Sequence, residues 1–159
     1  MTRRGAALGQ IVLGALWLGS AVLLAAVVAP AAFAVLPTRT LAGDLVGRVL
    51  PVIFWSGMVM FAAVMVFGVW TDANSRFKPR VLAAALGGTA CMIAQLVVDA
   101  MIARVQARIA GPVDALAATD PLRVAFGQLH VLSVVLLGIA MVGAAAILII
   151  AVRGLRTAP

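Results

Sequence analysis

The stretch from Val124 to Val152, VAFGQLHVLSVVLLGIAMVGAAAILIIAV, decides the fold class because it contains no Asp, Glu, Lys or Arg. A helix that crosses a bilayer needs about 20 mostly apolar residues, and this run is longer. The run does not alternate between apolar and polar residues, which favours a helix over a strand. A helix also satisfies its own backbone hydrogen bonds, as hydrocarbon requires. This stretch therefore predicts a transmembrane helix.

Three further uncharged runs precede this stretch and predict three more helices. They extend from Gly5 to Thr38, from Val49 to Thr71 and from Val81 to Val98. We expect an all-α integral membrane four-helix bundle that forms a single domain over 1–159, with spans near 10–35, 46–71, 80–103 and 123–152. The loops should be short, and Gly43 and Gly47 fall in the first outer loop. After a break at Gly111 we expect an amphipathic outer segment, from Val113 to Ala118.

Composition excludes the other common classes of protein. Apolar residues make up 65% of the chain and charged residues 11%, with a net charge of +7. A soluble domain of this size cannot bury so much apolar surface, and a disordered chain contains far less of it. The basic residues lie between the apolar runs and do not gather in one patch, which argues against nucleic acid as a partner. The lipid bilayer is the partner that the composition predicts.

Basic residues near the ends of the helices predict the orientation. Seven Lys and Arg fall on the side of the termini, including Arg3, Arg4 and the Arg76–Arg80 cluster, and five fall on the other side. Because basic loops stay in the cytoplasm, we expect a bacterial inner-membrane protein with both termini cytoplasmic. The first run is about twice as long as a signal-peptide core, so we expect it to be retained. Trp17 is expected in an aromatic belt near the inner surface.

Two ionisable residues lie inside the predicted spans, where such residues are costly and usually functional. Asp99 and His130 both fall in the outer third of the membrane when the spans are measured by the rise of a helix. Gln95 lies on the same helix face as Asp99, and Ser133 lies on the same helix face as His130. The second helix brings Trp55 to the same depth. We therefore predict a polar pocket, open to the outer face, with ligand-binding residues His130, Asp99, Gln95, Ser133 and Trp55.

The amino-acid sequence alone leaves the role of these five predicted pocket residues open. His130 would bind a ligand, a metal or a proton, and Asp99 would orient the imidazole. The alternatives are an interhelical hydrogen bond that fixes packing and pairing of Asp99 with Arg104. A single histidine excludes a bis-histidine haem within one chain, so a haem or metal would use His130 alone or a site shared between chains, and we expect neither. The chain has no GxSxG, P-loop or HExxH motif, so we lean against an enzyme.

Short motifs at the ends of the first and last helices are familiar. They are VVAPAAFAVL at 27–36, an LAG…G spacing at 41–47 and FGQLHVLS at 126–133. This pattern resembles the transmembrane protein 205-like family, the bacterial domain of unknown function 4149. The resemblance implies a small four-helix membrane protein without an assigned reaction. The positions that it singles out are Pro30, Phe33, Gly43, Gly47, Phe126, His130 and Ser133.

We expect a membrane protein that binds a ligand at its outward-facing pocket or assists a membrane partner. Two alternatives come from other classes: a haem or metal redox protein that uses His130, and a packing subunit of a larger membrane complex or homo-oligomer. Visible absorbance and a co-purifying partner would distinguish these functions.

Overall fold

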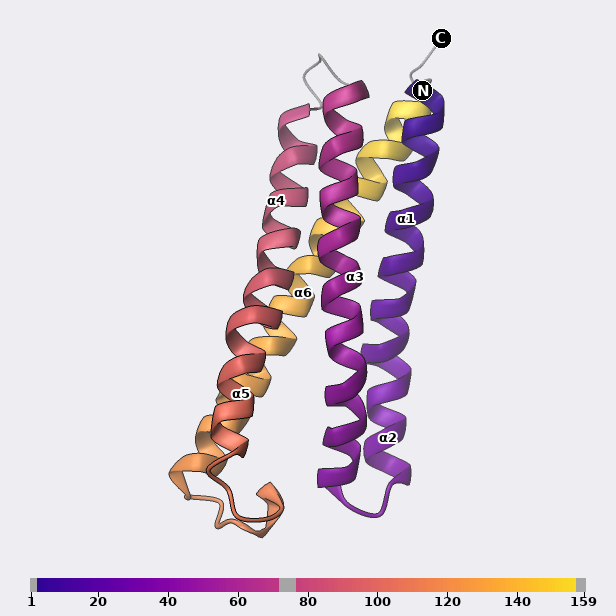
Figure 1. The fold of residues 1–159 in the computed structure, drawn as a ribbon. Helices are drawn as coiled ribbons and strands as arrows, with labels where there is room; N and C mark the ends of the chain where they lie inside the picture. The colour runs from indigo at the N-terminus through magenta and orange to yellow at the C-terminus, as the bar shows by residue number, and fades with distance from the viewer. Residues whose placement is uncertain (1–2, 72–76, 157–159) are drawn as a thin grey trace.

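Four long helical segments run from one end of the molecule to the other in the computed structural model, which describes residues 3–71 and 77–156 (Figure 1). The elements are α1 (Arg3–Leu23), α2 (Ala29–Val35), α3 (Arg39–Thr71), α4 (Phe77–Ile93), α5 (Asp99–Gln106) and α6 (Pro121–Arg156). A π-helical turn joins α1 to α2 and another joins α4 to α5, which makes each pair one continuous segment. Four segments are long and apolar enough to cross a membrane: Gly5–Val35, Arg39–Gly68, Pro79–Gln106 and Pro121–Leu155. The predicted all-α fold with four spans is confirmed.

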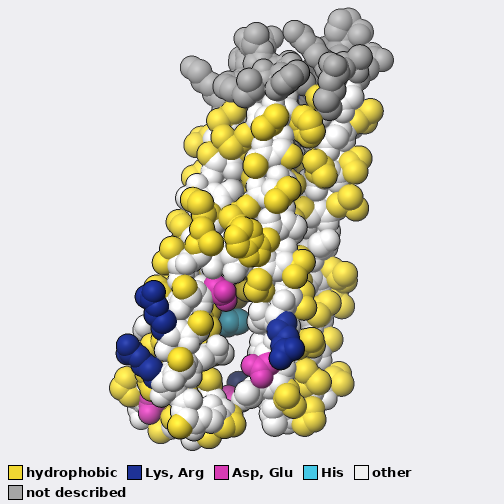
Figure 2. All heavy atoms as spheres, in the orientation of Figure 1, with side chains coloured by type: hydrophobic (Ala, Val, Ile, Leu, Met, Phe, Trp, Pro, Cys, Tyr) yellow, Lys and Arg dark blue, Asp and Glu magenta, His cyan; other side chains and the backbone are white. Residues whose placement is uncertain are grey.

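Large apolar side chains cover the outside of the bundle (Figure 2). Leu16, Val59 and Val142 are 66%, 69% and 71% exposed. Water-soluble proteins rarely expose continuous apolar surface on this scale. The chain is therefore a multi-pass membrane protein, and its outer surface is suited to lipid.

The core is built around an aromatic pair between α1 and α3. Trp17 and Phe61 meet edge to face, with ring centroids 5.6 Å apart. The indole Nε1 of Trp17 donates a 2.9 Å hydrogen bond to the carbonyl oxygen of Ile53. The expected place of Trp17 in an aromatic belt is therefore wrong, because the buried indole meets its hydrogen-bonding need inside the bundle.

Small residues let α4 and α6 approach closely. A Cβ added to Gly143 on α6 would lie 2.9 Å from the carbonyl oxygen of Ala83 and 3.4 Å from the Cα of Gly87, both on α4. A Cβ added to Gly87 would overlap the ring of Phe61 on α3. Ala140 and Ala144 are fully buried along the same face of α6. In a bilayer, contacts between small residues are a main source of helix association.

The two π turns have different local causes. The turn Leu24–Val28 lies just before Pro30, which has no N–H to donate to the carbonyl four residues earlier. The turn Ala94–Val98 contains no proline. π turns inside α-helices are uncommon and often occur at functional sites. The second turn therefore directs attention to the residues that it carries.

Both predicted outer loops differ from the structure. The first connection covers only residues 36–38, because α3 begins at Arg39, so Gly43 and Gly47 lie in a helix and not in a loop. Thr38 accepts a 3.2 Å hydrogen bond from the amide of Leu41, which helps to start α3 early.

The expected amphipathic outer segment is also wrong, because only the three residues Val113–Ala115 form a 3₁₀ turn. Gly111 turns the chain before it with a φ of +117°, which favours glycine. Short 3₁₀ pieces of this kind are common as connectors. The connection between the second and third spans, residues 72–76, lies outside the described residues.

Candidate functional site

A cavity lies among α3, α5 and α6. In Figure 1, α2 and α5 mark its end of the bundle, which is opposite the start of α1 and the end of α6. On one side, α2 and α3 are held together by the small buried cluster of Ala32, Ala42 and Val46. On the other side, α5 packs on α6. The cavity between them, which we call the loop-end pocket, has a volume of about 610 Å³. Its mouth is visible in Figure 2 as a hollow with the histidine inside.

Three continuous helical segments supply most of the pocket wall. The largest share comes from α3, between Arg39 and Phe54, and α6 contributes side chains between Arg123 and Ser133. Ala94 and Gln95 come from the π turn, and Asp99 opens α5. The turn that lacks a proline thus lies at the pocket.

Glycines keep the pocket empty of the chain's own side chains. Gly43 and Gly47 on α3 and Gly127 on α6 all line it. A Cβ added to any of the three would meet no atom within 4 Å. A larger side chain at these positions would therefore enter the pocket without a clash of its Cβ.

Two polar contacts hold the connecting loop at the rim. Thr40 at the start of α3 donates a 3.2 Å hydrogen bond from its hydroxyl to the Oδ2 of Asp114. The Nη1 of Arg123 donates a 2.6 Å hydrogen bond to the carbonyl oxygen of Leu116. The loop is thus tied to both α3 and α6 at the mouth of the pocket.

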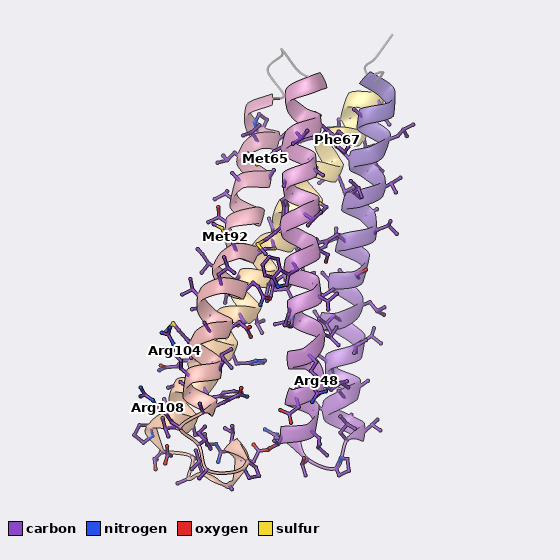
Figure 3. All side chains as sticks on the ribbon, in the orientation of Figure 1. Arg48, Met65, Phe67, Met92, Arg104 and Arg108 are labelled. Carbon is purple, nitrogen blue, oxygen red and sulfur yellow. The ribbon has the colours of Figure 1, made fainter. Side chains whose placement is uncertain are left out.

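Gln95 and Asp99 form one polar unit on the α5 side. The Nε2 of Gln95 donates a 3.2 Å hydrogen bond to the Oδ2 of Asp99. The Oε1 of Gln95 is buried and has no hydrogen-bond partner within the described chain. Arg104 and Arg108 point away from the bundle (Figure 3). The partner of Asp99 is therefore Gln95, and pairing with Arg104 is not observed among the residues that the structure describes.

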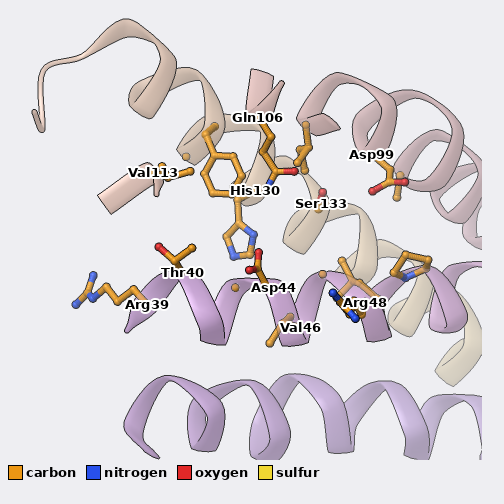
Figure 4. Close-up of a pocket in the computed structure, with 18 of the residues that line it drawn as sticks. Arg39, Thr40, Asp44, Val46, Arg48, Asp99, Gln106, Val113, His130 and Ser133 are labelled. Carbon is orange, nitrogen blue, oxygen red and sulfur yellow. The ribbon is translucent and has the colours of Figure 1, made fainter. Parts of the chain in front are cut away.

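His130 faces a residue that sequence analysis missed. In the close-up of the pocket its imidazole points across from α6 toward Asp44 on α3 (Figure 4). Among the described residues, no hydrogen bond or ion pair joins Asp44 to a partner. Arg48 lies one turn further along the same helix. Asp44 and Arg48 each follow one glycine of the Gly43–Gly47 spacing, and a spacing of four residues is typical of a helix. The predicted outer loop covers this segment, so Asp44 was not assigned to a helix.

The structure brings most of the predicted site residues into one place. His130, Asp99, Gln95 and Ser133 all line the loop-end pocket, and so do Phe33, Gly43, Gly47 and Phe126. Trp55 does not line it and is 53% exposed on the outside of the bundle. Pro30 is likewise exposed and is not part of the wall. The prediction for Trp55 rests on depth alone, and depth does not determine which way a side chain points around a helix.

A metal centre gains no support from the side chains. In residues 3–71 and 77–156, no three His, Cys, Asp or Glu side chains are grouped closely enough to hold a metal ion. Ser133 uses its hydroxyl hydrogen on the carbonyl oxygen of Leu129 at 3.2 Å. The chemistry that the pocket offers is therefore hydrogen bonding and charge, next to an apolar wall.

Of three comparisons with known proteins, the one with protein families gives a match. Comparison with curated proteins gives no match, and comparison with solved structures gives none either. The domain of unknown function DUF4149 matches residues 12–110, which is more than half of the chain and contains the α3 and α5 walls of the pocket. The chain therefore belongs to the family defined by this domain of unknown function.

Proposed function

We propose that this protein binds a small ligand in the loop-end pocket. The observation that carries the proposal is a cavity of about 610 Å³ inside a four-helix membrane bundle, lined by His130, Asp99, Gln95 and Ser133. Small-molecule pockets commonly have volumes of about 300–1,000 Å³ and combine apolar walls with a few polar groups.

The pocket belongs, in this proposal, to the outer face of a bacterial inner membrane, with both termini in the cytoplasm. The count of basic residues on the two sides supports this orientation. A relationship to the transmembrane protein 205-like family is part of the same proposal. It rests on the VVAPAAFAVL motif at 27–36, the LAG…G spacing at 41–47 and the FGQLHVLS motif at 126–133, of which the last lies beyond the residues that the family match covers.

The test compares two glycine substitutions on exposed helix faces. Gly47→Phe would place a ring in the pocket, whereas Gly138→Phe would place one outside it, and at both positions an added Cβ meets nothing within 4 Å. Each protein is extracted gently from its native host and examined by native mass spectrometry. We expect a bound mass on the wild type and on Gly138→Phe but not on Gly47→Phe.

Two outcomes would contradict the proposal: a wild-type protein that carries no ligand, or a bound mass that Gly47→Phe retains. Helix content by circular dichroism must be equal in the three proteins. The visible absorbance of the same samples tests the alternative of a haem protein. Haem bound through His130 would give a Soret band that is lost in His130→Ala.

A further inference from the structure

The loop-end pocket is crossed by a loop at its end and is open at its side. The loop between α5 and α6 is tied across the end, because Asp114 accepts a hydrogen bond from Thr40 and the carbonyl oxygen of Leu116 accepts one from Arg123. Figure 2 views the bundle from the side, in the orientation of Figure 1, and the histidine is visible inside a hollow in this face. The structure therefore offers a route into the pocket through the side of the bundle.

The side opening lies between α3 and α5. Helix α3 packs along α4, and α5 packs on α6, but no comparable packing joins α3 to α5, both of which the structure describes in full. Figure 1 shows the same divergence, since the segment formed by α4 and α5 moves away from α3 toward the loop end. Asp44 on α3 and Asp99 on α5 line the pocket and are nevertheless exposed, which places them beside this opening.

The surface on both sides of the opening is apolar. Leu45 and Val52 are exposed on α3, and Leu96, Val97 and Met101 are exposed on the segment that carries α5. The third span, Pro79–Gln106, has 28 residues, or about 42 Å at the rise of a helix, which is the thickness of a bilayer with its headgroup layers. Lipid therefore surrounds the opening, and a molecule that enters through it comes from the bilayer.

The charged side chains of the lining lie in the part of the pocket nearest the loop end. The deepest of them are Asp99, seven residues before Gln106, and Arg48, nine residues after Arg39, where their spans end. These separations correspond to about 10 Å and 14 Å along the helices. Each headgroup layer is about 5–8 Å thick. The charged part of the pocket therefore lies at the headgroup layer and just below it.

The deeper part of the pocket is apolar on the α3 side, where Leu50, Pro51 and Phe54 line it. The polar side chains at this depth are Gln95 and Ser133, and each makes a hydrogen bond within its own helical segment, to Asp99 and to the carbonyl oxygen of Leu129. The α3 wall thus changes from charged to apolar with depth. A membrane lipid changes in the same direction, from its headgroup to its acyl chains.

The charges of the lining are balanced between the two signs. They comprise three arginines and three aspartates, namely Arg39, Arg48, Arg123, Asp44, Asp99 and Asp114. A simple cation or a simple anion would meet repulsive groups as well as attractive ones. A zwitterionic phospholipid headgroup combines a negative phosphate with a positive amine, so it can complement both signs.

We propose that the loop-end pocket takes up a zwitterionic phospholipid from the surrounding bilayer, through the opening between α3 and α5. The headgroup lies among the charged residues, and an acyl chain lies along Leu50 and Phe54. The inference rests on the proposed ligand-binding function and names both the ligand and its route. A ligand from water would instead enter at the end that the loop crosses.

The experiment maps where a photoreactive lipid reaches the full-length protein. The protein is reconstituted into phosphatidylcholine vesicles, in which a fraction of the lipid carries a diazirine in the upper part of one acyl chain. Illumination joins the probe to nearby side chains, and mass spectrometry of the fragments locates the label. Leu50 lines the pocket and Val52 is exposed on the outside. Residues two apart do not share a face of a helix, so the two labels report different surfaces of α3.

The variant is Gly47→Phe, which places a ring in the pocket, and its control is Gly138→Phe, which places one outside it. We expect label on Leu50 and on Val52 in the wild type and in Gly138→Phe. Gly47→Phe should lose the label on Leu50 and keep the label on Val52. An excess of glycerophosphocholine, which has the headgroup but no acyl chains, should leave the label on Leu50 unchanged.

Absence of label on Leu50 in the wild type overturns the inference, and so does a label there that Gly47→Phe retains. Competition by glycerophosphocholine also overturns it, because the headgroup would then bind from water by itself. If Gly47→Phe still removes a natural ligand in native mass spectrometry, the proposed function stands and only the lipid and its route are wrong. If no ligand of any kind depends on the pocket, both proposals fail.

Discussion

Gly143→Ala tests whether the small-residue contact between α4 and α6 holds the bundle together. The added Cβ would lie 2.9 Å from the carbonyl oxygen of Ala83 and 3.4 Å from the Cα of Gly87. Both neighbours are backbone atoms, which cannot rotate away as a side chain can. The two helices must therefore move apart until the contact reaches the usual 3.4 Å or more.

The magnitude follows from two opposing effects. Overpacking of a close contact costs about 1–3 kcal/mol. Alanine is a better helix former than glycine by about 1 kcal/mol, which offsets part of this cost. Gly138→Ala supplies the control, because it brings the same gain in helix propensity on the same helix and its Cβ meets nothing within 4 Å. We expect Gly143→Ala to be less stable than Gly138→Ala by about 1–3 kcal/mol.

Unfolding by titration with sodium dodecyl sulfate in mixed micelles measures this difference. Tryptophan fluorescence, to which buried Trp17 contributes, reports loss of packing, and far-ultraviolet circular dichroism reports loss of helix. Equal midpoints for Gly143→Ala and Gly138→Ala would refute the reasoning, because α4 and α6 would then have room that the structure does not show.

The remaining predictions concern topology, the histidine and a buried amide. Alkaline phosphatase fused after Thr119 should be active and a fusion after Pro159 inactive, because the enzyme folds only outside the cytoplasm; the opposite pattern would reverse the orientation. His130→Gln should change the free energy of unfolding by less than about 0.5 kcal/mol and remove the natural ligand in native mass spectrometry, whereas loss of stability alone would indicate a packing role. Gln10 is fully buried and neither of its amide atoms has a hydrogen-bond partner among the described residues, so Gln10→Met should raise the free energy of unfolding by about 1–3 kcal/mol in the same titration; a lower stability would show that the amide is satisfied in the membrane.

The candidate site is predictable only in part. Asp99 and His130 stand out because ionisable residues are rare in apolar runs, and helical spacing adds Gln95 and Ser133. Their common depth then follows from the constant rise of a helix along its axis. Asp44 is not predicted because α3 begins at Arg39, several residues before the predicted start of the second span. Trp55 is predicted to line the pocket because it lies at the right depth, but depth does not determine which side of the helix a residue faces.

The amino-acid sequence was sufficient for the four helices and their apolar outer surface. Both depend on runs of neighbouring residues, since a helix in lipid satisfies its backbone within its own segment. The burial of Trp17, the pairing of Gln95 with Asp99 and the approach of His130 to Asp44 depend on how the helices are rotated and how closely they pack. Those features arise from contacts that the order of residues along one helix does not specify, so only the tertiary structure decides them.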